Sequence, residues 1–294
     1  MDLPFDPSAL KNDDLEGIGI GFSSIVIRIK GTKIVAKTFP PLDEDQHTER
    51  KIYEHLQKDG GGHPNVLRYF GRSPPDNELL RGGLLFEYHR RGILSAYFGK
   101  METLGVSEAE RRWFVDITFT FLESTEGSLI SQPIHNYSWP YQAVSAVAYI
   151  HSRGVVHADI GLHNFLIHDD GRLILCDFAG SGMEGLPNTI AGGVRYSNPK
   201  YDQRLYSTAE DDVFALGTVL YELECGKRLY EGQSDQDIAR QLRNQEFPDL
   251  YMIALPLRSV IEKCWTLEGY KADEAEAELG WDTTRLKASD QLFN

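Results

Sequence analysis

The sequence has few cysteines and no long apolar run. Only three cysteines occur among its 294 residues, Cys176, Cys225 and Cys264, and their wide spacing forms no metal-ligand pair. This usage is typical of a reducing intracellular compartment, where thiols fill the core. No stretch approaches the roughly 20 apolar residues of a membrane-spanning helix, and the acidic start, MDLPFDPSALKNDDLEG, lacks the apolar centre of a signal peptide. We therefore expect a cytoplasmic or otherwise intracellular protein with no membrane partner.

Basic residues are also scarce. Lysine and arginine total 30 against 44 aspartates and glutamates, which gives a formal net charge of −14. This average field repels nucleic acids and anionic membranes, so neither is expected as a main partner. The hydrophobic content of 41% and aromatic content of 11% are those of a globular protein. The length allows two lobes with a sizeable core.

The pattern of apolar runs predicts an α+β fold. Short β-branched or aromatic runs broken by glycine indicate strands in the first third, with one helix at HTERKIYEHLQK. Longer apolar or amphipathic runs, such as YQAVSAVAYIHS and EDDVFALGTVLYELE, predict helices in the remainder. We predict an N-terminal tail at 1–14, a β-rich N-lobe with one main helix at 15–88, and a mainly helical C-lobe at 89–294 that ends in a tail at 273–294.

One segment does not fit this pattern. The stretch ITFTFLESTEGSLISQPIHNYSWP alternates like a strand and then becomes rich in turn-forming residues. We interpret residues 116–140 as an insertion near the start of a helix. It is either a docking element or mistranslated sequence such as a retained intron.

Glycines punctuate the first strand-like stretch, GIGIGFSSIV. Gly19 and Gly21 would let backbone amides approach phosphate groups, and the branched Val26 could cover a nucleobase. Glycine-rich hairpins without a ligand are commoner, so the pattern is weak by itself. A strand follows these glycines, whereas a helix follows them in the dinucleotide-binding fingerprint, so that fold is not indicated.

Lys37, in IVAKTF, lies in a run whose neighbours suit a strand interior. A lysine there either points to water, which is the commoner arrangement, or pairs with a carboxylate. Glu49 and Glu54 are the two candidate partners. We favour Glu49 at the start of the helix, because Ile52 and Leu56 follow it as part of an apolar face and Glu54 points away from it.

Two further stretches hold polar residues that suit phosphate chemistry. HADIGLHNFLI carries Asp159 and, five positions on, Asn164, while CDFAG places Asp177 directly after an apolar run. Each could be an ordinary turn residue. Together they could supply a proton acceptor and hard oxygen ligands for a divalent cation.

Eight motifs occur in one order along the chain: a glycine-rich hairpin, VAK, a glutamate on a helix, FEY, HADIGLHN, CDFAG, RYSNP and DDVFALG. This order resembles the eukaryotic protein kinase catalytic domain over about Glu16 to Trp265, and in detail it is similar to a divergent group of fungal kinase-like proteins. The resemblance implies the bilobal protein kinase fold. It also implies an ATP- and Mg²⁺-dependent enzyme that phosphorylates a protein hydroxyl, with serine or threonine favoured, and that acts as a monomer.

The resemblance assigns roles to the polar residues. Asp159 would accept the proton of the substrate hydroxyl. Lys37, paired with Glu49, would hold the α- and β-phosphates, and Asn164 and Asp177 would bind Mg²⁺. The residues implied to contact the nucleotide are Gly19, Gly21, Val26, Ala36, Lys37, Glu87, His89 and Leu166.

Within that set, the segment from Glu87 to His89 would act through its backbone, and three apolar side chains, Val26, Ala36 and Leu166, would sandwich the base. Other residues have implied structural roles. His157 and Phe178 would stack with Tyr53, and Asp212 would anchor the loop that holds Asp159.

The sequence departs from the family at several positions. Ala158 replaces the arginine that usually binds a phosphorylated activation loop, so that switch is not expected here. Gly161 replaces a lysine that neutralises the moving phosphate, and Gly193 replaces the threonine that accompanies it. This loss costs roughly 2–4 kcal/mol in the transition state unless another cation, such as Arg195 or Lys200, substitutes. Lys200 also replaces a glutamate whose ion pair braces the large lobe, so a weaker brace is expected.

Two other functions remain open. The protein could be a pseudokinase scaffold that binds nucleotide with little or no turnover, which the missing lysine favours. It could instead be a small-molecule phosphotransferase of the antibiotic-kinase type, although FEY, CDFAG and DDVFALG match protein kinases better. An active protein kinase is favoured because all five polar residues assigned to catalysis and metal binding are retained.

Overall fold

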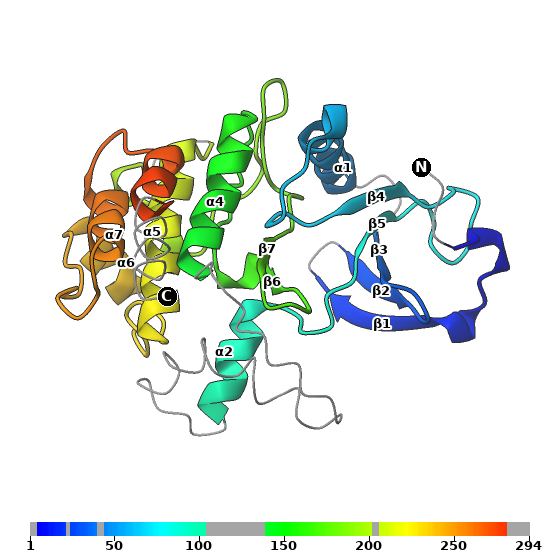
Figure 1. Cartoon of the computed structure of the whole chain (residues 1–294), viewed down its shortest axis with the longest axis horizontal. Coiled ribbons are helices and arrows are strands. Elements are labelled where there is room, and N and C mark those ends of the chain that lie inside the picture. The colour runs from blue at the N-terminus through cyan, green and yellow to red at the C-terminus, as the bar shows by residue number, and fades with distance from the viewer. Residues whose placement is uncertain (1–4, 22–23, 40–43, 104–138, 202–205, 281–294) are drawn as a thin grey trace, which may run out of the picture.

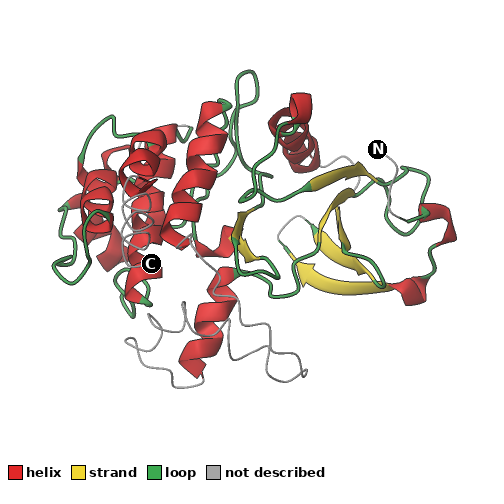
Figure 2. Cartoon of the chain, viewed as in Figure 1, coloured by secondary structure: helices red, strands yellow, loops and turns green. Residues whose placement is uncertain are grey.

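The computed structural model describes residues 5–21, 24–39, 44–103, 139–201 and 206–280. These residues form two lobes, one built around a β-sheet and one built from helices (Figures 1 and 2). The bilobal α+β architecture expected from the sequence is therefore confirmed. None of the helices in these ranges has the length and apolar character needed to cross a bilayer.

The N-lobe holds a sheet of five strands among the described residues, in the order β1-β2-β3-β5-β4, and each neighbouring pair is antiparallel. The strands are β1 (Leu15–Ile20), β2 (Ile25–Ile29), β3 (Ile34–Thr38), β4 (Tyr69–Arg72) and β5 (Leu84–Glu87). The runs IVIRI and IVAKT of β2 and β3 are rich in β-branched residues, which pack well on a pleated surface.

Successive side chains of these strands point to opposite faces of the sheet. On one face, Val35 and Phe86 pack with the helix α1 (Glu44–Leu56) in the main hydrophobic core. On the other face, Ala36 and Leu85 belong to a second, smaller cluster that Phe5 and Leu10 also contact. Part of the segment at 5–14 therefore packs against the back of the sheet.

Helix α1 carries Glu49 toward the sheet. Ile52 and Leu56 are fully buried on one side of the helix, whereas Glu54 is exposed, as the apolar spacing predicts. The prediction that the helix opens at Glu49 is wrong, because it begins at Glu44. The preceding turn is polar and has no apolar period that would reveal it in the sequence.

The C-lobe is mainly helical. Its elements are α2 (Leu94–Thr103), α4 (Trp139–Ser152), the hairpin of β6 (Phe165–Ile167) and β7 (Leu173–Leu175), α5 (Ala209–Cys225), α6 (Asp235–Arg243) and α7 (Leu257–Thr266), and residues 272–280 are also helical. The helices α4 and α5 bury most of their residues and form the centre of the lobe (Figure 1).

The predicted insertion and C-terminal tail extend beyond the described residues. Residues 116–138 of the predicted insertion lie outside those residues, but its last two, Trp139 and Pro140, belong to α4. The described part of the C-terminal tail is not a free end, because Ala275 and Leu279 are buried in the core.

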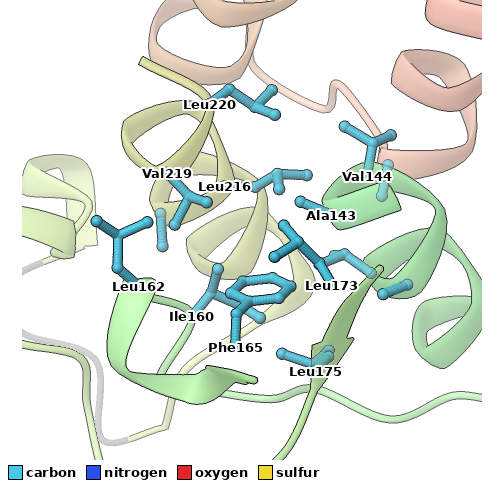
Figure 3. Close-up of a cluster of buried hydrophobic side chains, with 14 of the residues drawn as sticks. Ala143, Val144, Ile160, Leu162, Phe165, Leu173, Leu175, Leu216, Val219 and Leu220 are labelled. Atoms are coloured by element: carbon cyan, nitrogen blue, oxygen red, sulfur yellow. The ribbon is translucent and has the colours of Figure 1, made fainter. Parts of the chain in front are cut away.

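Buried apolar side chains anchor the loop between α4 and β6 in the hydrophobic core. Ile160, Leu162 and Phe165 are each at most 3% exposed, and Figure 3 shows them among side chains of α5 and β7, including Leu216 and Leu173. The side chains of Asp159 and His163, which alternate with these apolar residues, remain 22% and 41% exposed.

Candidate active site

Three charged side chains from separate elements meet between the lobes. Lys37 extends from β3, and its Nζ lies 2.8 Å from Oε2 of Glu49 on α1 and 2.7 Å from Oδ1 of Asp177, which follows β7. The predicted pairing of Lys37 with Glu49 is present. Asp177 has a left-handed backbone with φ of 65°, an unusual conformation for a residue with a side chain.

Two neighbouring carboxylates keep the ammonium group of Lys37 charged. Burial by itself lowers the pKa of Lys37, but the carboxylates of Glu49 and Asp177 outweigh it and hold the pKa above its ordinary value of 10.5. Burial raises the pKa of Glu49, against the opposing effect of Lys37. Burial also acts to raise the pKa of Asp177, but Lys37 shifts it below 3.8. Lys37 is thus a buried cation held by two carboxylates, and such a group suits anionic phosphates.

Asp159 and Asn164 face each other across the loop. Nδ2 of Asn164 donates to the backbone oxygen of Asp159 at 2.8 Å and to its Oδ2 at 2.9 Å. Both amide hydrogens of Asn164 are therefore used, and among the described residues none donates to its side-chain oxygen. Amide and carboxylate oxygens are ligands that Mg²⁺ prefers, so the oxygens of Asn164 and Asp177 fit this ion.

Asn164 and Asp177 would supply only part of the Mg²⁺ coordination shell, and the nucleotide would supply the rest. Across the described ranges, no group of three or more histidine, cysteine, aspartate or glutamate side chains forms a closed metal site. Proteins usually bind Mg²⁺ through one or two carboxylates together with substrate phosphates and water. Asp177 contacts Lys37 at 2.7 Å, and the backbone oxygen of Asn164 accepts the N–H of the adjacent Cys176 at 2.9 Å, so the two residues suit such a shared ion.

Asp212, buried on α5, fixes the backbone of the loop. Its Oδ2 accepts the N–H of His157 at 2.7 Å and its Oδ1 accepts the N–H of Ala158 at 2.8 Å, while His151 Nε2 donates to Oδ2 at 2.9 Å. Ala158 has φ of 68°, a conformation that L-residues rarely adopt. The carboxylate therefore holds a strained turn immediately before Asp159, and the predicted anchoring contact is present.

An aromatic column links the two lobes behind the charged residues. Phe178 packs edge-on against Tyr53 with ring centroids 5.0 Å apart and contacts His157 at 4.8 Å. His157 is fully buried, and its Nε2 donates to the backbone oxygen of Cys176 at 3.0 Å. The predicted packing role for His157 and Phe178 is confirmed.

The face of the sheet that carries Lys37 also carries part of the predicted nucleotide site. Val26 lies opposite Lys37 in the strand pairing and opposite Gly19 on β1, so these residues share one face. Val26 on β2 and Leu166 on β6 are both half-buried at the edge of the main core. The backbone N–H of Gly21 donates to the oxygen of Ser24 at 2.7 Å and closes the glycine hairpin.

The prediction that Ala36 contacts the nucleotide is wrong. Ala36 is fully buried on the opposite face, where it packs with Ile29 and Leu80 in the second cluster. Side chains alternate along a strand, so the residue on the same face as Lys37 is Val35. The sequence contained this signal, because Val35 is two positions from the lysine and Ala36 only one.

The segment from Glu87 to His89 connects the lobes. The N–H groups of Glu87 and Tyr88 donate to the backbone oxygens of Arg68 and Lys33, at 3.0 and 2.9 Å. The described residues offer no acceptor for the N–H of His89. That N–H is therefore available to a ligand at the position expected for the base.

The family described as protein kinase domain matches residues 13–271, nearly the whole chain. The chain belongs to the protein kinase family. Its Lys37–Glu49 pair has the contact that the resemblance implied.

Three relatives of the chain are named as kinases, and one of these three is named a serine/threonine-protein kinase. The kinase domain is 28% identical over 240 residues to CBL-interacting protein kinase 25 of Oryza sativa subsp. japonica, covering 71% of this chain and 41% of the relative. It is 31% identical over 147 residues to serine/threonine-protein kinase PrkC of Bacillus subtilis, covering 45% and 23%. It is 29% identical over 189 residues to NUAK family SNF1-like kinase 1 of Homo sapiens, covering 63% and 24%. The matches thus span less than half the length of each relative.

The large lobe of this kinase domain has a brace that the sequence did not suggest. Glu222, fully buried on α5, accepts a hydrogen bond from the hydroxyl of Tyr196 at 2.7 Å and one from the N–H of Leu229 at 3.1 Å. This contact ties the segment before Lys200 to the central helix. The expectation of a weaker brace, drawn from Lys200, did not include it.

The buried His89, in the segment that connects the lobes, is expected to make the stability of the fold sensitive to acid. His89 is 6% exposed, and no described residue forms a hydrogen bond with either ring nitrogen. Burial, and secondly the nearby His168, lower the pKa of His89 from 6.5 to about 4. The unfolded chain therefore binds a proton at a pH where the folded chain does not, so stability falls as the pH decreases from 6.5 toward about 4.

Replacing His89 with leucine is expected to reduce this acid sensitivity, because the substitution removes the titrating ring and keeps the backbone N–H. Urea unfolding of both proteins at about pH 7 and about pH 5 measures it. The wild type should lose more stability between these conditions than the variant. An equal loss would show that His89 is not the sensitive group.

Proposed function

We propose that the chain is an ATP- and Mg²⁺-dependent protein kinase that transfers the γ-phosphate to a serine or threonine hydroxyl of a protein substrate. The observation that carries the proposal is the contact of Lys37 with both Glu49 and Asp177, at 2.8 and 2.7 Å. The loop of Asp159 and Asn164 joins this cluster beside Asp177, because the N–H of Cys176 donates to the backbone oxygen of Asn164 at 2.9 Å. The names of the relatives support a serine or threonine acceptor. Transfer to small molecules is not favoured, since the family and its relatives are protein kinases.

The residues of the chain have distinct tasks in this reaction. Lys37 would hold the α- and β-phosphates, and Glu49 would hold the lysine in place. The hydroxyl oxygen of the substrate attacks the γ-phosphorus, the bond to the oxygen bridging to the β-phosphate breaks, and ADP leaves. Asp159 orients the hydroxyl and accepts its proton. When bound between Asn164 and Asp177, Mg²⁺ would neutralise phosphate charge.

The base of the nucleotide would lie between Val26 and Leu166, with Val35 in the place first given to Ala36. Gly19 and Gly21 would bring backbone close to the phosphates. Backbone groups of Glu87 and His89 would bind the edge of the base. The scarcity of cysteine, with three in 294 residues, supports a reducing intracellular setting, and we infer that the kinase acts there as a monomer.

A phosphorylation assay tests the proposal. Purified protein is incubated with γ-labelled ATP, Mg²⁺ and a peptide array, and labelled residues are identified by mass spectrometry. We expect Mg²⁺-dependent label on serine or threonine. Stabilisation by ATP without any transfer would contradict the proposal and indicate the nucleotide-binding scaffold, and label found only on small molecules would indicate the other class of phosphotransferase.

A further inference from the structure

His163 contacts the proposed catalytic base. It lies in the short 3-10 turn Leu162–Asn164, and its Nε2 is 3.0 Å from Oδ2 of Asp159. An ionised carboxylate can only accept hydrogen bonds, so Nε2 must carry the hydrogen and donate it. The ring of Tyr196 packs on His163 with centroids 6.1 Å apart, so the imidazole is held from two directions.

The same ring explains the glycine at position 161. Gly161 has φ of −175° and ψ of 165°, an extended backbone that any residue can adopt, so the backbone does not demand glycine. A Cβ at this position would lie 2.5 Å from Cε1 and 2.7 Å from Nδ1 of His163, so any side chain here would force the imidazole to move. The imidazole therefore occupies the space that the usual lysine side chain needs.

The contacts also leave the two carboxylate oxygens of Asp159 in different surroundings. Oδ2 accepts from His163 and from Nδ2 of Asn164 at 3.0 and 2.9 Å. Oδ1 lies toward Gly192, where an added Cβ would be 3.8 Å from it. Among the described residues none donates a hydrogen bond to Oδ1, so this oxygen can accept one from a substrate hydroxyl.

We propose that His163 is a positioning residue that orients the Asp159 carboxylate and that Gly161 is its steric counterpart. This inference rests on the proposed kinase function. His163 and Asn164 hold Oδ2 from two sides, which turns Oδ1 toward the acceptor hydroxyl. The usual lysine at position 161 is then absent because the imidazole takes its space. In this chain His163 orients the loop, and Gly161 makes room for it.

A double-mutant cycle tests the pairing. His163→Leu removes the donor, and Gly161→Ala displaces the ring, so each is expected to lower kcat by about ten- to a hundredfold with an unchanged KM for ATP. Adding Gly161→Ala to His163→Leu should have no further effect, because the contact is already lost. Effects that multiply in the double variant would overturn the proposal.

A conservative variant and a control sharpen the test. Glutamine can place an N–H where Nε2 lies, so His163→Gln should retain clearly more activity than His163→Leu. His47 is exposed on α1, where its Nδ1 contacts Arg50, and His47→Leu should leave kcat unchanged. Equal kcat values for wild type, His163→Leu and His163→Gln would overturn the inference.

A spectroscopic readout separates this inference from the proposed function. Long-range ¹H–¹⁵N NMR of the imidazoles, assigned with His163→Gln, is expected to show His163 as the Nε2–H tautomer, and the Nδ1–H tautomer would contradict the proposal whatever the activity. If the wild type transfers no phosphate, the proposed function fails. If it transfers phosphate as fast as His163→Leu, only the role of His163 fails.

Discussion

Replacing Asp159 with asparagine is expected to lower phosphoryl transfer by about 10²- to 10⁴-fold, the contribution of a positioned proton acceptor. Asparagine has the size of aspartate, and its oxygen can still accept the hydrogen bond from Asn164. It cannot take up the proton of the substrate hydroxyl. Since Lys37, Glu49 and Asp177 are unchanged in this variant, ATP binding is expected to stay the same.

The measurement compares initial rates of labelled phosphate transfer with the dissociation constant of ATP. Asp169→Asn is the matched control, because Asp169 lies in the β6–β7 hairpin and pairs with Arg90 at 3.1 Å, away from the loop. This control should retain wild-type rates. If Asp159→Asn is as active as the control, the carboxylate is not the proton acceptor.

Replacing Asp212 with alanine is expected to destabilise the protein by about 3 kcal/mol, because buried donors left without partners cost roughly 1–3 kcal/mol each. The carboxylate is 1% exposed and accepts the N–H groups of His157 and Ala158. Ala158 has a positive φ that these bonds stabilise. We also expect transfer activity to fall even where the variant is folded, because the turn before Asp159 can relax.

The neighbouring residue supplies a control for this prediction. Asp211 caps α5, where its Oδ2 accepts the N–H of Thr208 at 2.7 Å, and its replacement by alanine should cost only about 1 kcal/mol. Urea unfolding of wild type, Asp211→Ala and Asp212→Ala gives the three free energies of unfolding. A loss for Asp212→Ala no larger than that of Asp211→Ala would refute the proposed anchoring of the loop.

Local periodicity predicted two features of the site, whereas the roles of Asp159, Asn164 and Asp177 were implied by the resemblance. Glu49 was preferred over Glu54 from the spacing of Ile52 and Leu56, and the structure buries Glu49 and exposes Glu54. The strand that follows Gly19 and Gly21 was also expected, and it is β2. Both inferences needed only the period of a helix or a strand.

The errors also have physical causes. Ala36 was assigned from its position beside Lys37, whereas strand alternation puts Val35 on that face. The first turn of α1 was missed because it is polar, so amphipathic spacing could not reveal it.

Two contacts could not be predicted from the sequence, because they depend on where side chains meet in space. Tyr196 and Glu222 are 26 residues apart and join only through the packing of the C-lobe. His163 is four residues from Asp159, but the sequence does not show the ring orientation that excludes a side chain at Gly161. The missing lysine was read as a loss, and Arg195 and Lys200 were considered as substitutes instead.

The most direct test of the proposed cleft is anomalous diffraction from Mn²⁺ in crystals grown with a non-hydrolysable ATP analogue. We predict that Mn²⁺ binds beside the side-chain oxygens of Asn164 and Asp177, with the triphosphate against Nζ of Lys37 and its terminal phosphate toward Oδ1 of Asp159. A metal peak at another place, or a triphosphate beyond the reach of Lys37, would contradict the assignment of this cleft to phosphoryl transfer.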